Sequence, residues 1–204
     1  MKKILLVSMF QNVSNILKLV EKDIKGKTIT YIITASKVEK LGFLIRMSKW
    51  ILKSLGLIID ELDISNTPYE TIKSKLENND YIFVTGGNTF FLLQELKRTK
   101  TDKIIINEVN KGKLYIGESA GAIVVSPSIE YSKAMDSIEK APNLKDFTGL
   151  HLVNFYTVPH DNNWEFKKAV REIVDKYSKT LELSVINDKQ AILIENDKIK
   201  ILSK

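Results

Sequence analysis

The chain has 204 residues, 44% of them hydrophobic, with no cysteine and a formal net charge of +6. Because no linker or composition shift divides it, we expect residues 1–204 to form one domain with a sizeable core. The lack of cysteine excludes disulfides, thiolate metal sites and a cysteine nucleophile. Most basic residues are lysines scattered among acidic residues, and the arginines are only Arg46, Arg98 and Arg171. This pattern is typical of a solvated surface and not of a nucleic-acid-binding one.

The first residues resemble a secretion signal only superficially. Polar Gln11, Asn12 and Ser14 cut the apolar run short, and no small-residue cleavage site follows. No stretch approaches the roughly 20 apolar residues that span a bilayer. The apolar face of residues 43–55 is expected to pack on a sheet and not on a membrane. We therefore expect a cytoplasmic protein without a nucleic-acid or membrane partner.

Short β-rich runs alternate with longer stretches of helical apolar spacing along the first part of the chain. Runs such as Tyr81-Ile82-Phe83-Val84 lack polar alternation, as parallel strands covered on both faces do. The sequence therefore predicts an α/β fold, a doubly wound and mostly parallel sheet with flanking helices. Its first predicted strands are residues 3–8, 28–34, 57–64, 81–85 and 113–117.

After Pro127 the alternation of strand and helix patterns becomes less regular. It resumes with a predicted strand at 152–158 and a predicted helix at 163–179. Residues 190–195 and 198–202, around Asn196-Asp197, predict a hairpin that adds antiparallel strands at one edge of the sheet. Such edge strands are either paired in a dimer or protected by lysine. Monomer and homodimer both stay open.

The run Gly117-Glu118-Ser119-Ala120-Gly121 follows a short apolar run and precedes another. This is the pattern of a nucleophile elbow, in which a strained turn between strand and helix exposes the serine Oγ. Glycines two residues before and after the serine let the two backbones approach closely. A plain glycine-rich turn between a strand and a helix would fit the same letters.

In open α/β sheets the ligand site lies beyond the carboxyl ends of the strands. The run Thr85-Gly86-Gly87-Asn88-Thr89 lies at such an end. The N–H of Gly86 or Gly87 is expected to approach an oxyanion, with the Ala120 amide as the second donor. A tight turn with Asn88 as helix N-cap explains the same residues.

Histidine is the usual base for a serine nucleophile near neutral pH. The chain has two, His151 and His160. His160 closes a predicted strand at the end of the sheet where the site is expected, whereas His151 lies at the start of that strand. The sequence therefore favours His160 as the general base.

These features, residues 85–89, residues 117–121 and Pro159-His160, resemble in order and spacing the peptidase E family of serine peptidases, the α-aspartyl dipeptidases. The resemblance spans nearly the whole chain and implies a class I glutamine amidotransferase-like fold, with serine in place of the amidotransferase cysteine. It implies Ser119 as nucleophile, His160 as general base and the amides around Gly87 and Ala120 as oxyanion hole. Hydrolysis would pass through an acyl-enzyme, and no metal or organic cofactor would be needed.

In peptidase E-like proteins the third triad member is an aspartate in the segment after the proline that corresponds to Pro127. An ungapped alignment places Ala134 there. We assign the role to Asp136 by assuming a two-residue shift in a loop, and Glu130 and Asp161 remain open. The orienting carboxylate holds the imidazole tautomer, so its identity bears on activity.

Aspartyl dipeptidases recognise the N-terminal aspartate partly through an arginine in the helix after the catalytic histidine. Residues 163–168 contain no arginine here, and Lys167 supplies a charge without the planar fork of arginine. Glu118 is expected to pair with a substrate's α-ammonium group, or else to be a surface residue of the turn. Asn88 is the other expected substrate contact.

The sequence thus predicts a serine peptidase for short peptides, above all dipeptides, with an N-terminal aspartate as the preference that the family implies. A small-molecule esterase or amidase would use the same triad. A non-catalytic amidotransferase-like binding protein would keep the pocket without turnover. Both alternatives stay open from the sequence.

Overall fold

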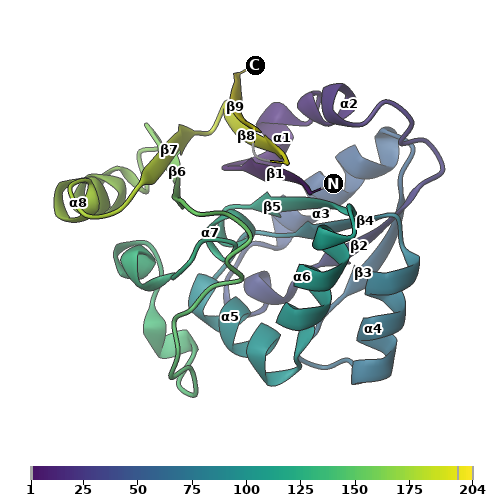
Figure 1. Cartoon of the computed structure of the whole chain (residues 1–204), viewed down its shortest axis with the longest axis horizontal. Helices are drawn as coiled ribbons and strands as arrows, with labels where there is room; N and C mark the ends of the chain where they lie inside the picture. The colour runs from purple at the N-terminus through teal and green to yellow at the C-terminus, as the bar shows by residue number, and fades with distance from the viewer. Residues whose placement is uncertain (1, 197, 204) are drawn as a thin grey trace.

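The computed structural model describes residues 2–196 and 198–203 and is built around a seven-stranded sheet (Figure 1). Five strands of this sheet pair in parallel, while residues 190–195 and 198–203 form an antiparallel hairpin beside the first strand of the chain. The predicted α/β fold and the edge hairpin are confirmed, although Asp197 of the expected turn lies outside the described residues. The order across the sheet is β3 (Ile58–Leu62), β2 (Thr28–Ile32), β4 (Tyr81–Val84), β5 (Leu114–Glu118), β1 (Lys3–Val7), β8 (Gln190–Glu195) and β9 (Lys198–Ser203).

Helices cover both faces of this sheet (Figure 1). Alternate strand residues point to opposite sides, so Ile4 and Leu6 belong to one buried cluster and Leu5 and Val7 to the other. One face carries α1 (Phe10–Val13), α2 (Ile16–Val20) and α3 (Gly42–Ser54), and the other carries α4 (Tyr69–Asn78), α5 (Thr89–Arg98), α6 (Thr101–Asn110) and α7 (Ala120–Ile123).

The α3 helix packs on the sheet as its apolar face predicts. Its Leu52 is fully buried, while Phe43 and Trp50 are exposed on the other side of the helix. Within the described residues, no helix combines the length and the apolar character that crossing a membrane requires.

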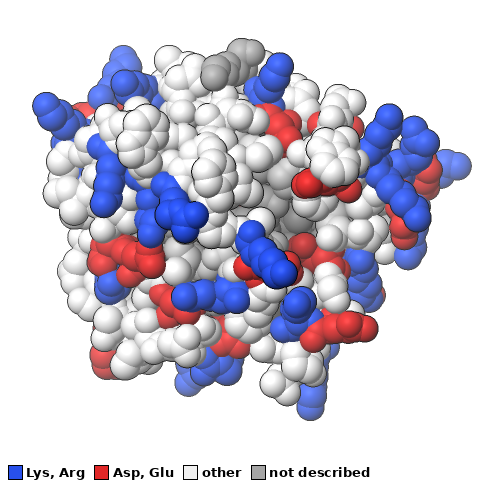
Figure 2. Space-filling model, turned by 180° about the vertical axis from the view of Figure 1, so that it is seen from behind, with Lys and Arg blue, Asp and Glu red and all other residues white. Residues whose placement is uncertain are grey.

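On the face drawn in Figure 2, basic and acidic side chains lie interspersed. Among the described residues, lysines form ion pairs with carboxylates, such as Lys49 with Glu61 and Lys97 with Asp146, each at 2.5 Å. Exposed pairs of this kind contribute little to stability, typically about 0.2–1 kcal/mol each. Their presence agrees with the solvated, lysine-rich surface expected from the sequence.

Beyond the elbow the chain is less regular than predicted. The predicted strand at 152–158 is wrong in its limits, because β6 spans Tyr156–Asp161. Leu152 and Val153 are buried, yet their N–H groups both donate to the Val125 carbonyl and not to a neighbouring strand. His151 therefore lies in a loop before β6, where it is exposed and its Nε2 contacts Asn154.

A strand that the sequence analysis missed, β7 (Leu183–Asn187), pairs with β6 in a separate two-stranded parallel sheet. The predicted helix at 163–179 is shorter than expected, because α8 spans Lys167–Tyr177. It packs against β6 and against the 3₁₀ helix η2 (Glu130–Ala134). A further 3₁₀ turn, η3 (Ile138–Lys140), contacts α5.

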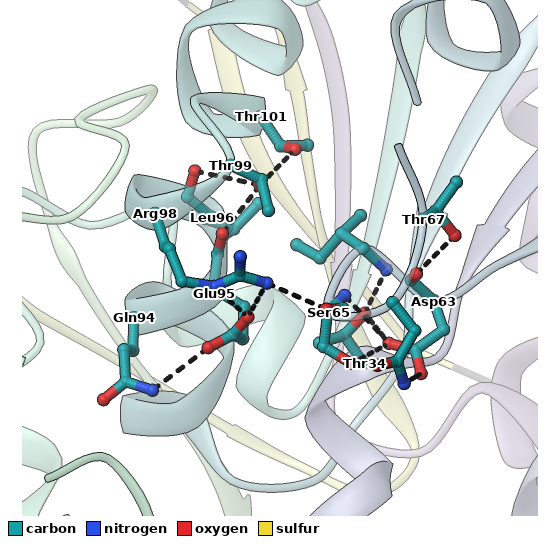
Figure 3. Close-up of polar contacts among 12 residues, drawn as sticks. Thr34, Asp63, Ser65, Thr67, Gln94, Glu95, Leu96, Arg98, Thr99 and Thr101 are labelled. Carbon is teal, nitrogen blue, oxygen red and sulfur yellow. Dashed lines mark hydrogen bonds and ion pairs between the residues drawn. The ribbon is translucent and has the colours of Figure 1, made fainter. Parts of the chain in front are cut away.

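A polar network holds the 3₁₀ helix η1 (Thr34–Val38) against the loop after β3 (Figure 3). Asp63 Oδ1 accepts hydrogen bonds from Thr34 Oγ1 at 3.1 Å and from Ser65 Oγ at 2.7 Å. Arg98 donates to the Ser65 carbonyl and also pairs with Glu95, which ties the loop to α5. The next residue of η1, Ala35, is thereby fixed behind the turn of residues 85–89.

The register of the central strands brings their carboxyl ends together. Val7 pairs with Glu118 across β1 and β5, and Val84 pairs with Gly117 across β4 and β5. The residues that follow these strands therefore meet at one edge of the sheet, where an α/β fold binds its ligands.

Candidate active site

Ser119 occupies a strained turn between β5 and α7. Its φ of 49° and ψ of −106° lie in a region that residues with a side chain rarely adopt. Its N–H donates to the Val7 carbonyl at 2.9 Å, which fastens the turn to β1. A Cβ on Gly117 would lie 2.3 Å from the Gly121 carbonyl oxygen, and one on Gly121 would lie 2.3 Å from the Val84 carbonyl oxygen. Both glycines are thus required by close backbone contacts, as in a nucleophile elbow.

His160, near the end of β6, faces this serine. Its Nε2 lies 2.9 Å from Ser119 Oγ. The residue is 6% exposed, and its ring stacks on Phe166, with ring centroids 4.3 Å apart and 18° between the planes. The structure therefore brings Ser119 and His160, predicted from separate motifs, within hydrogen-bonding distance.

The other ring nitrogen of His160 contacts Asp188, in the turn between β7 and β8. The Nδ1 to Oδ1 distance is 2.9 Å. Asp188 also accepts hydrogen bonds from Ser8 Oγ at 2.6 Å and from Asn163 Nδ2 at 2.7 Å. Burial raises the pKa of Asp188, but the hydrogen bonds from His160, Ser8 and Asn163 outweigh it and hold the pKa below its ordinary value.

An ionised Asp188 only accepts hydrogen bonds, so it fixes the tautomer of His160 with the proton on Nδ1. The unprotonated Nε2 is then free to accept the hydrogen bond of Ser119 Oγ. The arrangement is a continuous chain from serine hydroxyl to imidazole to carboxylate, which is the geometry that activates a serine nucleophile.

Asp136, which the sequence analysis assigned to this third position, makes other contacts. Its Oδ2 accepts from Thr89 N at 2.9 Å and Thr89 Oγ1 at 2.5 Å, at the start of α5. The carboxylate that contacts His160 Nδ1 is that of Asp188. Asp136 still lines the pocket beside Ser119, and burial raises its pKa.

The two open alternatives for the triad acid also lie elsewhere. Glu130 is exposed and pairs with Lys133 at 2.7 Å. Asp161 ends β6, and its Oδ2 accepts from the Asn162 side chain. The signal that could have indicated Asp188 is its position just after a strand, one residue beyond the β-branched run Val185-Ile186 and Asn187.

The turn of residues 85–89 packs tightly against η1. Gly87 has a φ of 138°, and a Cβ there would lie 2.2 Å from the Ala35 carbonyl oxygen. The neighbouring Gly86 N–H donates to the Glu118 carboxylate, which also accepts from Phe10 N at 2.8 Å. Burial raises the pKa of Glu118. Glu118 thus holds two backbone segments together at the base of the pocket.

The other predicted substrate contacts lie apart from the pocket. Asn88 is fully buried; its Oδ1 caps α5 by accepting from Phe91 N, and its Nδ2 donates to the Ser137 carbonyl. The N-cap interpretation of Asn88 is therefore the one that its contacts match. Lys167, the first residue of α8, is exposed and is not among the pocket-lining residues.

The pocket beside Ser119 and His160 has a volume of about 280 Å³. Its walls come from the ends of β1, β4 and β5, the start of α3, and the segments around Asp136 and Phe166. Among its described lining residues, the side chains that carry a full charge in their ordinary state are all carboxylates, and none is lysine or arginine. The acidic ones are Glu39, Glu118, Asp136 and Glu165.

Comparisons with known proteins identify the family of this chain. The model of peptidase family S51 matches residues 4–202. An uncharacterized peptidase of Listeria monocytogenes is 47% identical over 98% of this chain and 97% of its own length. One from Pasteurella multocida is 48% identical over 97% of this chain and 95% of its own length. A peptidase E of Nostoc is 37% identical over 55% of this chain and 43% of its own length.

Two solved structures share the fold. A crystal structure of a candidate peptidase E from Listeria monocytogenes EGD-e superimposes with a TM-score of 0.96 at 46% identity, over 100% of this chain and 99% of that one. A peptidase from an acI-B1 actinobacterium is only 16% identical and, with a TM-score of 0.72 over 100% of this chain and 88% of that one, shows the fold alone. The family match and the near-identical fold together establish that the chain belongs to peptidase family S51.

Proposed function

We propose that this S51 family member is a serine peptidase that hydrolyses dipeptides and other short peptides through an acyl-enzyme. The single observation that carries the proposal is the hydrogen-bonded chain in which His160 lies 2.9 Å from Ser119 Oγ and 2.9 Å from Asp188 Oδ1. In this proposal Ser119 is the nucleophile, His160 the general base and Asp188 the orienting acid. Asp188 takes the role that the sequence analysis gave to Asp136.

The reaction follows from this geometry. His160 Nε2 takes the hydroxyl proton as Ser119 Oγ attacks the scissile carbonyl carbon. The C–N bond then breaks, and His160 gives the proton to the leaving amine. A water molecule, deprotonated by the same Nε2, attacks the ester carbonyl carbon. The bond from that carbon to Ser119 Oγ then breaks, His160 returns the proton to Oγ, and the acid product leaves. Asp188 keeps the imidazole in the productive tautomer and stabilises the imidazolium.

The oxyanion that forms during both steps needs backbone donors. Gly86 N–H is already engaged by Glu118, so Gly87 N–H is the better candidate of the two glycine amides. Ala120 N–H, at the first position of α7, is the second proposed donor. The closeness of Gly87 to Ala35 supports a donor held in a fixed position, because neither backbone segment has room to move toward the other.

The size and charge of the pocket bear on the substrate. A volume of about 280 Å³ lies just below the roughly 300–1,000 Å³ typical of small-ligand sites, which suits a dipeptide. Acidic lining residues favour a free α-ammonium group and disfavour a negative side chain. We therefore propose that neutral or basic first residues are preferred over the N-terminal aspartate that the family resemblance implies.

The test is a panel of dipeptides assayed with the purified protein, with Ser119→Ala and an exposed-serine control, Ser54→Ala. The panel contains Ala-Leu, Lys-Leu, Asn-Leu, Asp-Leu and N-acetyl-Ala-Leu, with p-nitrophenyl acetate as the ester. We expect Ala-Leu or Lys-Leu to be cleaved best by the wild type and Ser54→Ala, and not by Ser119→Ala. Turnover of the ester alone would favour an esterase, and no turnover of any compound would favour a binding protein.

A further inference from the structure

Ser8, the residue directly after β1, lies between His160 and Asp188. It is 1% exposed. Its Oγ lies 2.6 Å from Asp188 Oδ1, 2.7 Å from the backbone nitrogen of His160 and 3.0 Å from His160 Nδ1. Nothing in the sequence pattern marks this serine, because it is a single small polar residue at the end of an apolar strand.

We propose that Ser8 is a positioning residue for the triad, one that sets the orientation of the His160 ring and of the Asp188 carboxylate together. The inference rests on the proposed function, because it concerns how that triad is held. Ser8 does not touch the reacting atoms, since the ring of His160 separates it from Ser119.

The first support is that all the hydrogen-bonding capacity of the Ser8 hydroxyl is used within the triad. A hydroxyl has one proton to donate and two lone pairs that accept. The proton goes to Asp188 Oδ1, one lone pair accepts the His160 backbone N–H, and the other faces Nδ1–H. The Nδ1 proton therefore lies between two oxygens, at 2.9 Å and 3.0 Å, which restricts the rotation of the ring.

The second support comes from the backbone of His160. Its φ is 68°, a left-handed conformation that is costly for a residue with a side chain. The register between β6 and β7 shifts between Val158 and Asp161, so His160 sits in an irregularity of the strand pair. The Ser8 hydroxyl supplies an acceptor for the His160 N–H at this point.

The proposal is tested by the rate at which a fluorophosphonate probe labels Ser119, which needs no knowledge of the natural substrate. In this step the Ser119 Oγ–P bond forms, the P–F bond breaks, fluoride leaves and the serine proton passes to His160. The variants are Ser8→Ala, Asp188→Ala and the double variant. Ser48→Ala serves as control, because Ser48 is also 1% exposed and bonds to Tyr31 away from the triad.

We expect Ser8→Ala to slow labelling by about 10- to 100-fold, the range for loss of a hydrogen bond to a charged group. In the Asp188→Ala background the same change should slow it by no more than about threefold, because residues that act through one another are not additive. The low-field proton resonance of His160 Nδ1–H should shift or broaden in Ser8→Ala and stay in place in Ser48→Ala.

The possible outcomes distinguish the proposed function from the proposed role of Ser8. A wild type that is not labelled at Ser119 overturns the proposed function and the role of Ser8 with it. A labelled wild type with an equally fast Ser8→Ala overturns the role of Ser8 alone. The role of Ser8 is also overturned if Ser8→Ala slows labelling equally with and without Asp188, because Ser8 would then act independently of Asp188. If Ser8→Ala does not fold, Ser8→Cys, which keeps the volume but donates weakly, must show the slowing.

Discussion

Asp188 Oδ1 and His160 Nδ1 lie 2.9 Å apart although 28 residues separate them in sequence. The contact depends on the parallel pairing of β6 and β7, in which Asp161 pairs with Asn187, the residue before Asp188. The histidine and the acid therefore come from the ends of two adjacent strands, while Ser119 comes from the main sheet. The site is assembled where the small sheet meets the large one.

The close packing of the elbow predicts a large cost for a methyl group at Gly121. A Cβ there would lie 2.3 Å from the Val84 carbonyl oxygen. We expect Gly121→Ala to lower the free energy of unfolding by about 1–3 kcal/mol or more, as overpacking of a core does. Urea unfolding followed by circular dichroism measures the change.

The matched control for this measurement is Gly42→Ala in α3. Its nearest neighbour would be Arg46 Nη1 at 3.8 Å, so the methyl group meets no clash. An alanine in a helix is favoured over glycine by roughly 0.5–1 kcal/mol, and the control should be neutral or slightly stabilised. Equal stability of Gly121→Ala and the wild type would show that the elbow is not packed as described.

The acidic pocket predicts a pH dependence of substrate binding. Burial raises the pKa of Asp136, and the nearby Glu39 charge adds to this increase. Only the ionised carboxylate, which predominates above that pKa, attracts an α-ammonium group. The KM for a free dipeptide should therefore fall as the pH rises through the pKa of Asp136. Steady-state kinetics between about pH 4 and pH 8, from near the ordinary aspartate pKa to above the ordinary histidine pKa, would detect this.

Two controls test whether the pH dependence of KM comes from Asp136 and the substrate's α-ammonium group. N-acetyl-Ala-Leu lacks the positive charge, so its KM should not fall over the same range. Asp136→Asn removes the titrating group and should flatten the profile of the free dipeptide. If the KM of the free dipeptide depends on pH in Asp136→Asn as it does in the wild type, another group causes the dependence.

The Asp63 network predicts a loss of stability in acid. Burial raises the pKa of Asp63, but the hydrogen bonds from Ser65 and Thr34 and the charge of Lys37 outweigh it and lower the pKa overall. A carboxyl whose pKa is lower in the folded state stabilises the fold above its unfolded pKa, and this contribution is lost as the pH falls through the folded pKa.

Asp63→Asn should therefore lower the unfolding free energy at pH 7 by about 1–2 kcal/mol. The difference from the wild type should shrink as the pH drops below about 3.9, the ordinary aspartate pKa. Thermal melts at several pH values measure it, with the exposed Asp23→Asn as control. If the difference in unfolding free energy stays constant down to the lowest pH measured, the charge of Asp63 does not contribute to stability.

The central strands and the elbow could be predicted because their signals are local. Apolar runs without alternation mark buried parallel strands, and glycines at fixed distances from Ser119 mark the close backbone contacts that the structure has. The position of His160 beside Ser119 follows from the same reasoning, since strand ends in such a sheet converge on one edge.

The acid that contacts His160 could not be found in this way. Asp188 reaches His160 only because β6 and β7 pair, and β7 is a short, mostly half-buried strand with a weak pattern of its own. Asp136 lies in an irregular segment, and its partner Thr89 is 47 residues away in sequence. Contacts between distant irregular segments depend on tertiary packing, which residue spacing does not encode.

The most direct test of the proposed triad compares Asp188→Ala with Asp136→Asn on the best-cleaved dipeptide, measuring kcat and KM separately. We predict that Asp188→Ala lowers kcat on the order of 10³- to 10⁴-fold with KM little changed, as loss of a triad acid does. Asp136→Asn should raise KM and leave kcat within about threefold, because it removes binding and not chemistry. The reverse pattern, with kcat lost in Asp136→Asn and kept in Asp188→Ala, would contradict the account.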